Sequence, residues 1–150
     1  MLAHERKANP MIKELVTDEA TLSMPCTPVT AEEAPALQAD LLDTIAAHED
    51  AACIAANQLG TTKAACVYLD ESDTPHVIFN PVLKRALRPF KVEETCITRT
   101  EASRVTRFER ITVTYDELND GALVSRKKEF NGWTAQIIQH MIDHCKGKLV

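Results

Sequence analysis

Two histidines near the C-terminus, His140 and His144, have the spacing of a metal-binding pair. Positions i and i+4 of a helix lie above one another on the same face, so one metal ion can accept a ring nitrogen from each. Such a short motif also arises by chance, and the pair alone is equally consistent with two ordinary histidines packed between surface and core. The pair therefore suggests a metal site without establishing one.

The residue after the first histidine decides which chemistry a metal there could support. Many metal-dependent hydrolases carry H-E-x-x-H, in which the glutamate is the general base. In this chain Met141 occupies that position, and a thioether carries no proton at neutral pH. The sequence keeps the ligand spacing and lacks the acid–base group, which on motif reasoning alone weakens the prediction of an enzyme.

The cysteines are the other residues able to bind metal or attack a substrate. Their odd number, wide spacing and lack of a C-x-x-C pair argue against a disulfide framework and favour free thiols in a cytoplasmic protein. One of them could be a ligand or a nucleophile, but composition does not say which. The five are Cys26, Cys53, Cys66, Cys96 and Cys145.

Length and composition limit what the whole chain can be. The 150 residues suit one domain, and 45% hydrophobic residues supply enough apolar mass for a core. No apolar run approaches the roughly 18 residues of a membrane helix. Charges near the N-terminus stand where a signal peptide has its apolar region, which favours a cytoplasmic location. A net charge of -5 without a cluster of basic residues argues against a nucleic-acid surface.

The spacing of apolar residues predicts the elements that must position these side chains. An amphipathic helix is expected over 31–49, behind Thr30 and Glu33, which have the spacing of a capping box. Strands are expected over 64–69 and 76–79, with a hairpin loop over 70–75 and an end at Asn80–Pro81. The first dozen residues are expected to form a loose lead-in.

The second half of the chain predicts a further hairpin and a last helix. Strict alternation marks a half-buried strand over 111–115, a turn follows at 119–121, and 123–130 can return as the partner strand. Asn131 can cap a helix that carries His140 and His144. The expected fold is one domain over 1–150, of the α+β class, with antiparallel strands packed around this C-terminal helix.

Three blocks of the sequence resemble peptide deformylases, specifically a short bacterial class. Residues 53–58, Cys-Ile-Ala-Ala-Asn-Gln, are similar to the family's G-x-G-L-A-A-x-Q, and residues 94–98, Glu-Thr-Cys-Ile-Thr, to E-G-C-L-S. Residues 132–144 are similar to G-x-x-A-x-x-x-Q-H-E-x-D-H. The resemblance extends from about Met11 to Val150, and three blocks in the same order are far more specific than one.

The resemblance implies a metal-dependent amide hydrolase that removes the N-formyl group from the formyl-methionine of nascent peptides in the cytoplasm. The implied ligands are Cys96, His140 and His144, which would leave a fourth position for water. Fe²⁺ is the expected ion, and Zn²⁺, Ni²⁺ or Co²⁺ can occupy the same ligands. The side-chain amide of Gln58 and the backbone N–H of Ile97 match the donors to the developing oxyanion.

The resemblance also implies how a substrate would bind. Ile54, Trp133 and Ile137 would line the pocket for the methionine side chain, although each could equally be a core residue. Glu94 has its own place in the second block, and Arg107 matches an arginine near the peptide-binding strand. The implied partners are N-formylated or free N-terminal peptides, with association with the ribosome as an open possibility and neither nucleic acid nor membrane expected.

The chain departs from the family pattern at positions that matter for activity. Met141 replaces the catalytic glutamate, Thr95 replaces a glycine, and Cys53 replaces another glycine, where a positive φ would strain the loop. General acid–base catalysis supplies about 10²–10⁴-fold, so activity is expected to be lost or strongly reduced. Rescue by Glu93 or Glu94 is not expected. The alternatives are a non-catalytic homologue that binds metal or N-terminal peptides, and a structural domain with a vestigial site.

Overall fold

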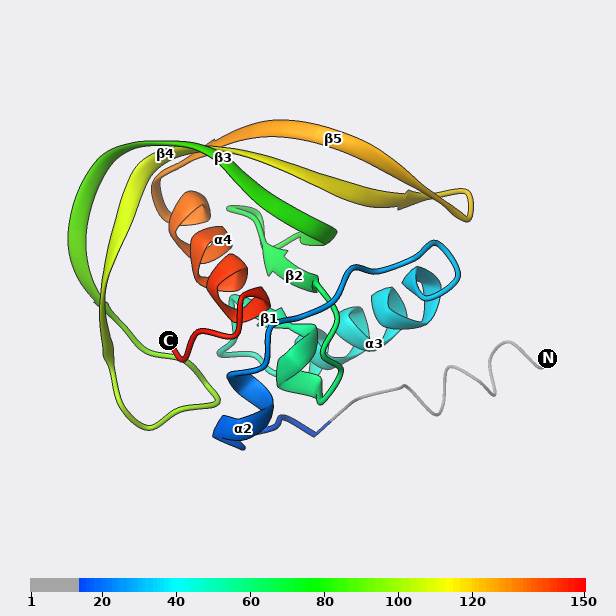
Figure 1. Ribbon diagram of the computed structural model, residues 1–150, viewed down its shortest axis with the longest axis horizontal. Helices are drawn as coiled ribbons and strands as arrows, with labels where there is room; N and C mark the ends of the chain where they lie inside the picture. The colour runs from blue at the N-terminus through cyan, green and yellow to red at the C-terminus, as the bar shows by residue number, and fades with distance from the viewer. Residues whose placement is uncertain (1–13) are drawn as a thin grey trace.

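The computed structural model describes residues 14–150, so the lead-in predicted for the first dozen residues lies outside the described residues. Five strands form one antiparallel sheet in the order β1-β2-β3-β4-β5, and the helices pack on it (Figure 1). This confirms the α+β class. The elements are α2 (Glu19–Leu22), α3 (Ala34–Ala47), β1 (Cys53–Ala55), the 3-10 helix η1 (Ala56–Leu59), β2 (Ala65–Leu69), β3 (Pro75–Glu94), β4 (Ser103–Asn119), β5 (Ala122–Asn131) and α4 (Gly132–Cys145).

The sheet curves around the C-terminal helix. In Figure 1, β3, β4 and β5 arch over α4, with β1 and β2 beside it. Isoleucines and valines of β4 alternate inward, and Ile111 and Val113 pack there with Ile138 of α4 in one buried cluster. The predicted helix with His140 and His144 is confirmed, and its burial makes it the centre of the fold.

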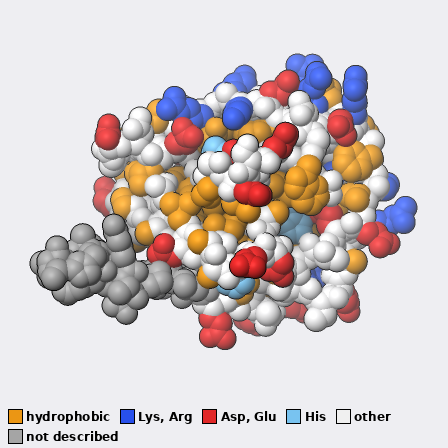
Figure 2. Space-filling model, turned by 180° about the vertical axis from the view of Figure 1, so that it is seen from behind, with side chains coloured by type: hydrophobic (Ala, Val, Ile, Leu, Met, Phe, Trp, Pro, Cys, Tyr) orange, Lys and Arg blue, Asp and Glu red, His pale blue; other side chains and the backbone are white. Residues whose placement is uncertain are grey.

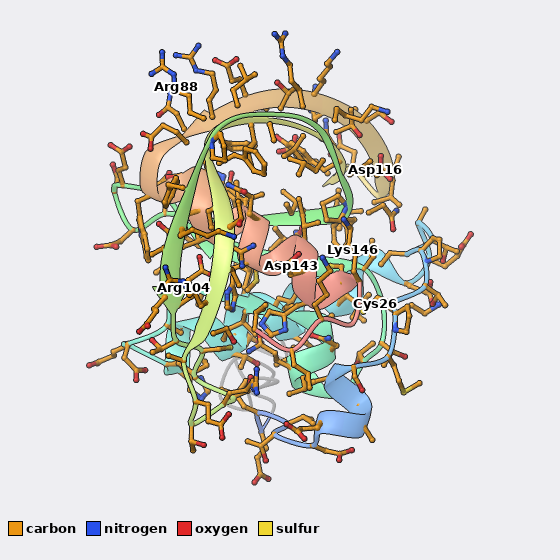
Figure 3. All side chains as sticks on the ribbon, turned by 60° about the vertical axis from the view of Figure 1, so that its left-hand side comes forward. Cys26, Arg88, Arg104, Asp116, Asp143 and Lys146 are labelled. Carbon is orange, nitrogen blue, oxygen red and sulfur yellow. The ribbon has the colours of Figure 1, made fainter. Side chains whose placement is uncertain are left out.

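The charged side chains are not spread evenly. On the face drawn in Figure 2, most Lys and Arg side chains lie along the upper and right-hand edges, and hydrophobic side chains form a central band with acidic groups among them. Figure 3 places Arg88 on the outside of the arch. Within the described residues, no helix is long and apolar enough to cross a membrane.

The predicted end of β3 at Asn80–Pro81 is wrong, because the strand continues to Glu94. Pro81 has no N–H for a ladder bond, but it lies where the register between β3 and β4 shifts, between Phe79 and Val82. Asn80 has a φ of 52° there, and its side-chain amide donates to Asp116 of β4 at 3.0 Å. A β-bulge therefore accommodates the proline, and β3 continues to Glu94, the first residue of the 94–98 block.

The other predicted strands lie at the expected places: β4 and β5 have wider bounds than predicted, and β2 begins one residue later, at Ala65. The 119–121 turn is confirmed, with positive φ at Asp120 and Gly121. The loop after β2 is closed by Asp70, whose N–H donates to the carbonyl of Thr74 at 3.0 Å. The predicted segment 111–115 is the middle of β4, which spans Ser103–Asn119.

The helix starts differ in detail from the predictions. The carboxylate of Glu33 accepts the backbone N–H of Thr30 at 3.0 Å, so one half of the predicted capping box is present before α3. Asn131 is the N-cap residue of α4, but its side chain makes no capping hydrogen bond. Helix α2 was not predicted, although Asp18 caps it by accepting from the N–H groups of Ala20 and Thr21.

A turn after α4 brings the C-terminal segment against the chain that follows α2. Gly147 has a φ of 79°, and a Cβ built there would lie 2.5 Å from the carbonyl oxygen of Ser23. Gly121 has the same φ of 79° but nothing within 4 Å of a built Cβ. The two glycines therefore share a backbone conformation and differ only in packing.

We expect Gly147→Ala to destabilise the protein more than Gly121→Ala. In both variants an alanine with left-handed backbone lowers the free energy of unfolding by about 1–2 kcal/mol. The clash with the Ser23 carbonyl lowers it by about 1–3 kcal/mol more in Gly147→Ala. Urea unfolding of the two variants measures the difference. Equal losses would show that the turn shifts freely and that the close approach constrains nothing.

Candidate metal centre

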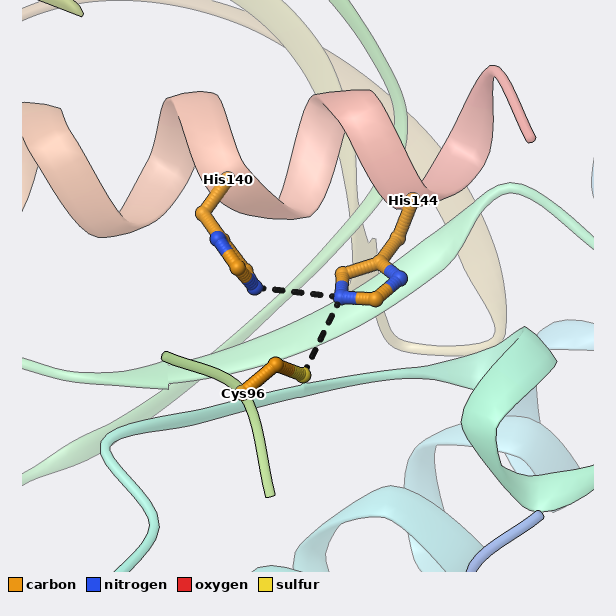
Figure 4. Close-up of side chains that lie close together, drawn as sticks. All are labelled: Cys96, His140 and His144. Carbon is orange, nitrogen blue, oxygen red and sulfur yellow. Dashed lines mark hydrogen bonds between the residues drawn. The ribbon is translucent and has the colours of Figure 1, made fainter. Parts of the chain in front are cut away.

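Cys96, His140 and His144 meet at one point between the loop after β3 and helix α4. Their candidate ligand atoms all lie within 4.8 Å of one another. Cys96 Sγ is 3.5 Å from His144 Nε2, which is 3.1 Å from His140 Nε2 (Figure 4). The two imidazoles are buried and the thiol is half-buried. The predicted convergence of these residues is confirmed.

The donor set and its spacing fit a divalent ion. Ligands held about 2.0–2.3 Å from a tetrahedral ion lie about 3.3–3.6 Å from one another, close to the 3.5 Å from Cys96 to His144 and the 3.1 Å from His144 to His140. Catalytic zinc sites have three protein ligands and one open position, and thiolate and imidazole are both ligands that zinc and other borderline divalent ions accept. The three residues can therefore hold a metal without rearranging the fold.

The cluster is electrostatically prepared for this role. Burial by itself would raise the pKa of Cys96, but interactions with His140, His144 and Thr98 outweigh it and bring that pKa down to about 5. Burial would lower the pKa of His140, but Cys96 and Glu94 raise it to about 9. The lowered pKa of Cys96 favours its thiolate, which is the ligand form, whereas His140 has to give up a proton to bind a metal through Nε2.

Glu94, at the end of β3, links β4 to α4 through hydrogen bonds of its carboxylate. Its carboxylate accepts from both Arg107 Nε at 2.9 Å and Arg107 Nη2 at 2.7 Å, from His140 Nδ1 at 2.9 Å and from Gln136 Nε2 at 3.0 Å. Burial raises its pKa, but the bonds from His140 and Arg107 lower it to about 2. The bond to Nδ1 fixes the His140 ring so that Nε2 faces Cys96 and His144.

Arg107 is the cation of this network. It reaches Asp143 of α4 at 2.7 Å as well as Glu94, and all three side chains are largely buried. Figure 3 shows Asp143 on α4, beneath the arch of the strands. Burial would lower the pKa of Arg107, but the two carboxylates raise it. Arg107 therefore links strands β3 and β4 to α4 and is not a solvent-exposed charge.

Gln58 reaches the cluster from η1. Its Nε2 donates to Cys96 Sγ at 3.2 Å and to Thr98 Oγ1 at 3.0 Å, and its Oε1 accepts the N–H of Ala55 at 2.8 Å. The side chain is completely buried. The structure thus places Gln58 beside the metal ligands, while its action on an oxyanion stays a prediction, as does that of the Ile97 N–H.

A cavity of about 500 Å³ opens beside His140 and Cys96. Trp133, 61% exposed, and Ile137 line it, together with Ile97 and Glu94. Met141 also lines it, although almost none of this side chain reaches solvent. An apolar thioether therefore forms the wall where the family pattern has a carboxylate.

Two residues expected at the substrate site do not line this cavity. Strand β1 alternates, so Cys53 faces the cavity while its neighbour Ile54 packs fully buried into the cluster under α3. Arg107 lies behind Glu94 in the buried network. Any contact of Ile54 or Arg107 with a substrate is thus unsupported by this arrangement.

The departure at Cys53 causes no backbone strain. Among the described residues, positive φ at positions other than glycine occurs only at Asp73, Asn80, Arg88 and Asp120. Burial, with the charges of Cys96 and Glu94, raises the pKa of Cys53 to about 12, so its thiol stays protonated. Cys66 is buried and Cys26 and Cys145 are half-buried, consistent with packing roles.

Sequence reasoning missed several residues that hold the ligands in place. Gln136, Asp143 and Thr98 received no role, yet each contacts Glu94, Arg107 or Cys96. Gln136 precedes His140 by one helical turn, a spacing that could have indicated it. The contact of Asp143 with Arg107 joins residues 36 positions apart and had no local signal.

We expect Arg107→Leu to destabilise the protein by about 3–5 kcal/mol, because two buried carboxylates lose their counter-charge. Arg126→Leu is the control, since Arg126 pairs with Glu117 at 2.8 Å in an exposed salt bridge and should cost less than about 1 kcal/mol. Urea unfolding compares them. Similar losses would mean that the buried network contributes no more than a surface pair.

We also expect Cys96→Ser to weaken Co²⁺ binding by more than the roughly 10–100-fold that the loss of an outer partner costs. The thiolate-to-cobalt absorption should disappear with it. Cys26→Ser, which changes a half-buried cysteine outside the cluster, should leave both unchanged. Competition with a coloured chelator gives the affinity. Unchanged affinity in Cys96→Ser would remove the cysteine from the metal site.

Comparisons with known proteins agree with this geometry. The family model described as polypeptide deformylase matches residues 12–150. A peptide deformylase of Clostridium beijerinckii is 34% identical over 141 residues, which is 93% of this chain and 100% of that protein.

Solved structures extend the comparison to the fold. The crystal structure of peptide deformylase from Thermus thermophilus gives a TM-score of 0.79 at 27% identity, over 92% of this chain and 82% of that one. A Met-Ala-Ser-bound class I type b deformylase from Acinetobacter baumannii gives 0.79 at 22% identity, over 92% and 95%. Because the sequence, the fold and the ligand cluster all match, we conclude that the chain belongs to the peptide deformylase family.

Proposed function

We propose that this protein is a metal-dependent hydrolase that removes the formyl group from N-terminal formyl-methionine of peptides in the cytoplasm, with activity strongly reduced by Met141. The observation that carries the proposal is the Cys96, His140 and His144 cluster at the wall of an open cavity. Fe²⁺ is the proposed native ion, and Zn²⁺, Ni²⁺ or Co²⁺ suits the same donors.

The chemistry divides between the ion and the chain. A divalent ion held by the three ligands would supply Lewis acidity toward water and the formyl oxygen. Gln58 is the first proposed donor to negative charge that develops beside the ligands, and it would redirect an N–H of Nε2 that it now donates to Cys96 or Thr98. The N–H of Ile97, the next residue after the ligand cysteine, is the second proposed donor.

Substrate binding is proposed from the walls of the cavity. Trp133, Ile137 and Met141 give it an apolar side, which suits the side chain of an N-terminal methionine. The Acinetobacter baumannii relative, which shares the fold, was solved bound to Met-Ala-Ser. That complex supports an N-terminal peptide as the class of ligand for this cavity.

The missing step is the transfer of a proton to the leaving amine. Met141 cannot carry one, and a general acid–base is worth about 10²–10⁴-fold. Glu94 does not replace it, because Arg107, His140 and Gln136 occupy its carboxylate. With its pKa held at about 2, Glu94 is also a poor base. The amine would therefore leave slowly.

A second candidate function is the binding of free N-terminal peptides without turnover. The exposed carboxylates of Asp50 and Glu93 line the cavity, and no Lys or Arg is among its described lining residues. Negative charge at the cavity favours a free α-ammonium over a neutral formamide. Calorimetric titration with Met-Ala-Ser and its N-formyl form separates the two candidates, since a binding protein should prefer the free amine.

We expect the natural protein, loaded with one equivalent of Co²⁺ or Ni²⁺, to deformylate formyl-Met peptides at least about 10²-fold more slowly than its Met141→Glu variant. Release of free amine measures the rate. Met141→Gln is the matched control, because its side chain is similar in size and polar but does not transfer a proton as a carboxylate does.

Two outcomes would contradict this account. A natural protein as fast as Met141→Glu would mean that another group moves the proton. Equal gains in Met141→Glu and Met141→Gln would show that the polarity of the wall, and not a proton carrier, limits the rate. Metal content is measured in each preparation, so that incomplete loading is not mistaken for a slow step.

A further inference from the structure

Two buried side-chain atoms in the described part of the chain have no hydrogen-bond partner, Asn57 Oδ1 and His144 Nδ1. Their residues are already in contact, because Asn57 Nδ2 donates to the carbonyl oxygen of His144 at 2.9 Å. Asn57 is 0% exposed and His144 is 1% exposed. Leaving a buried polar group unpaired costs about 1–3 kcal/mol, so two in contacting residues call for an explanation.

The chemistry of the two atoms is complementary. His144 Nε2 faces Cys96 and His140, and Figure 4 shows Nδ1 turned away from both. When Nε2 is the ligand atom, a neutral imidazole carries its hydrogen on Nδ1, which is then a donor. Asn57 uses its amide N–H toward the carbonyl of His144, so the atom left over is an acceptor. One donor and one acceptor are thus unpaired.

Asn57 lies next to the metal ligands both in the sequence of η1 and in space. It lies in η1 directly before Gln58, whose amide donates to Cys96. The short turn η1 therefore contacts a cysteine ligand with one side chain and a histidine ligand with the next. The sequence pattern G-x-G-L-A-A-x-Q leaves the position of Asn57 open, so the resemblance assigns it no role.

We propose that Asn57 is a positioning residue for the metal ligand His144. Its Nδ2 holds the backbone of His144, and its Oδ1 accepts the Nδ1 hydrogen through one buried water. The Asn57 side chain then fixes both the end of α4 and the rotation of the His144 imidazole. Glu94 fixes the rotation of the other imidazole in the same way, by accepting from His140 Nδ1. This inference rests on the metal centre of the proposed function and not on hydrolytic turnover.

Metal affinity is the readout, because loss of such an outer partner costs about 10–100-fold in affinity. Asn57→Leu keeps the approximate size and removes both contacts, and it should weaken Co²⁺ binding by that factor. Asn57→Asp keeps an acceptor for the Nδ1 hydrogen but loses the Nδ2 donor to the His144 carbonyl, so it should recover only part of the loss. Competition with a chelator gives each dissociation constant.

Asn80→Ala is the matched control for general destabilisation. Asn80 also ties two segments together, through Val29 and Asp116, but it lies outside the cluster. Its loss should lower the melting temperature and leave Co²⁺ affinity within about twofold of the natural protein. A similar loss of Co²⁺ affinity in Asn80→Ala would show that general destabilisation, and not the lost contact with His144, explains the result for Asn57→Leu.

A measurement on the natural protein keeps the proposal open to refutation if Asn57→Leu does not fold. Nitrogen NMR of the Zn²⁺-loaded protein should show His144 Nδ1 protonated, with a hydrogen that exchanges slowly. An unprotonated Nδ1, or Asn57→Leu binding Co²⁺ within twofold of the natural protein, would overturn the proposal. Tight Co²⁺ binding without deformylation would contradict the proposed activity and leave the role of Asn57 standing, whereas no Co²⁺ binding at all would refute both.

Discussion

The carboxylate of Glu94 is buried where a strand, a neighbouring strand and the C-terminal helix meet, and its charge must be satisfied there. Arg107 supplies the counter-charge from β4, and His140 and Gln136 donate to it from α4. A buried carboxylate stripped of these partners would be strongly destabilising. The network therefore sets the distance between arch and helix, and it also sets the direction of the His140 ring beside the loop that brings in Cys96.

The metal site is a consequence of this packing. Helix α4 fixes the separation of its two histidines, β3 ends where Cys96 can reach them, and η1 closes the other side through Gln58 and Asn57. His140 and Cys96 are each held by an outer side chain, Glu94 and Gln58, and Asn57 holds the backbone of His144. Met141 sits within the same well-packed helix without disturbing it. The ligand set can thus persist while the group that moves a proton is absent.

Local patterns were enough to predict the helices α3 and α4, the turn at 119–121 and the hairpins that pair β2 with β3 and β4 with β5. They failed at Pro81, because the bulge that accommodates it depends on Asn80 reaching Asp116 across the sheet. The ligands could be predicted because Cys96, His140 and His144 lie in the second and third blocks that resemble the deformylase pattern. Ile54 could not be placed, since a three-residue strand gives no sign of which face is buried. The bond from Asn57 to His144 spans 87 positions and leaves no trace in the local sequence.

X-ray absorption at the metal edge of the Co²⁺- or Zn²⁺-loaded protein tests the central claim most directly, because it reports the donor atoms without requiring turnover. The account predicts one sulfur at about 2.3 Å and two imidazole nitrogens at about 2.0–2.1 Å, with one further light donor completing four. A metal shell without sulfur, or one with a single imidazole, would contradict the assignment of Cys96, His140 and His144 as the metal centre.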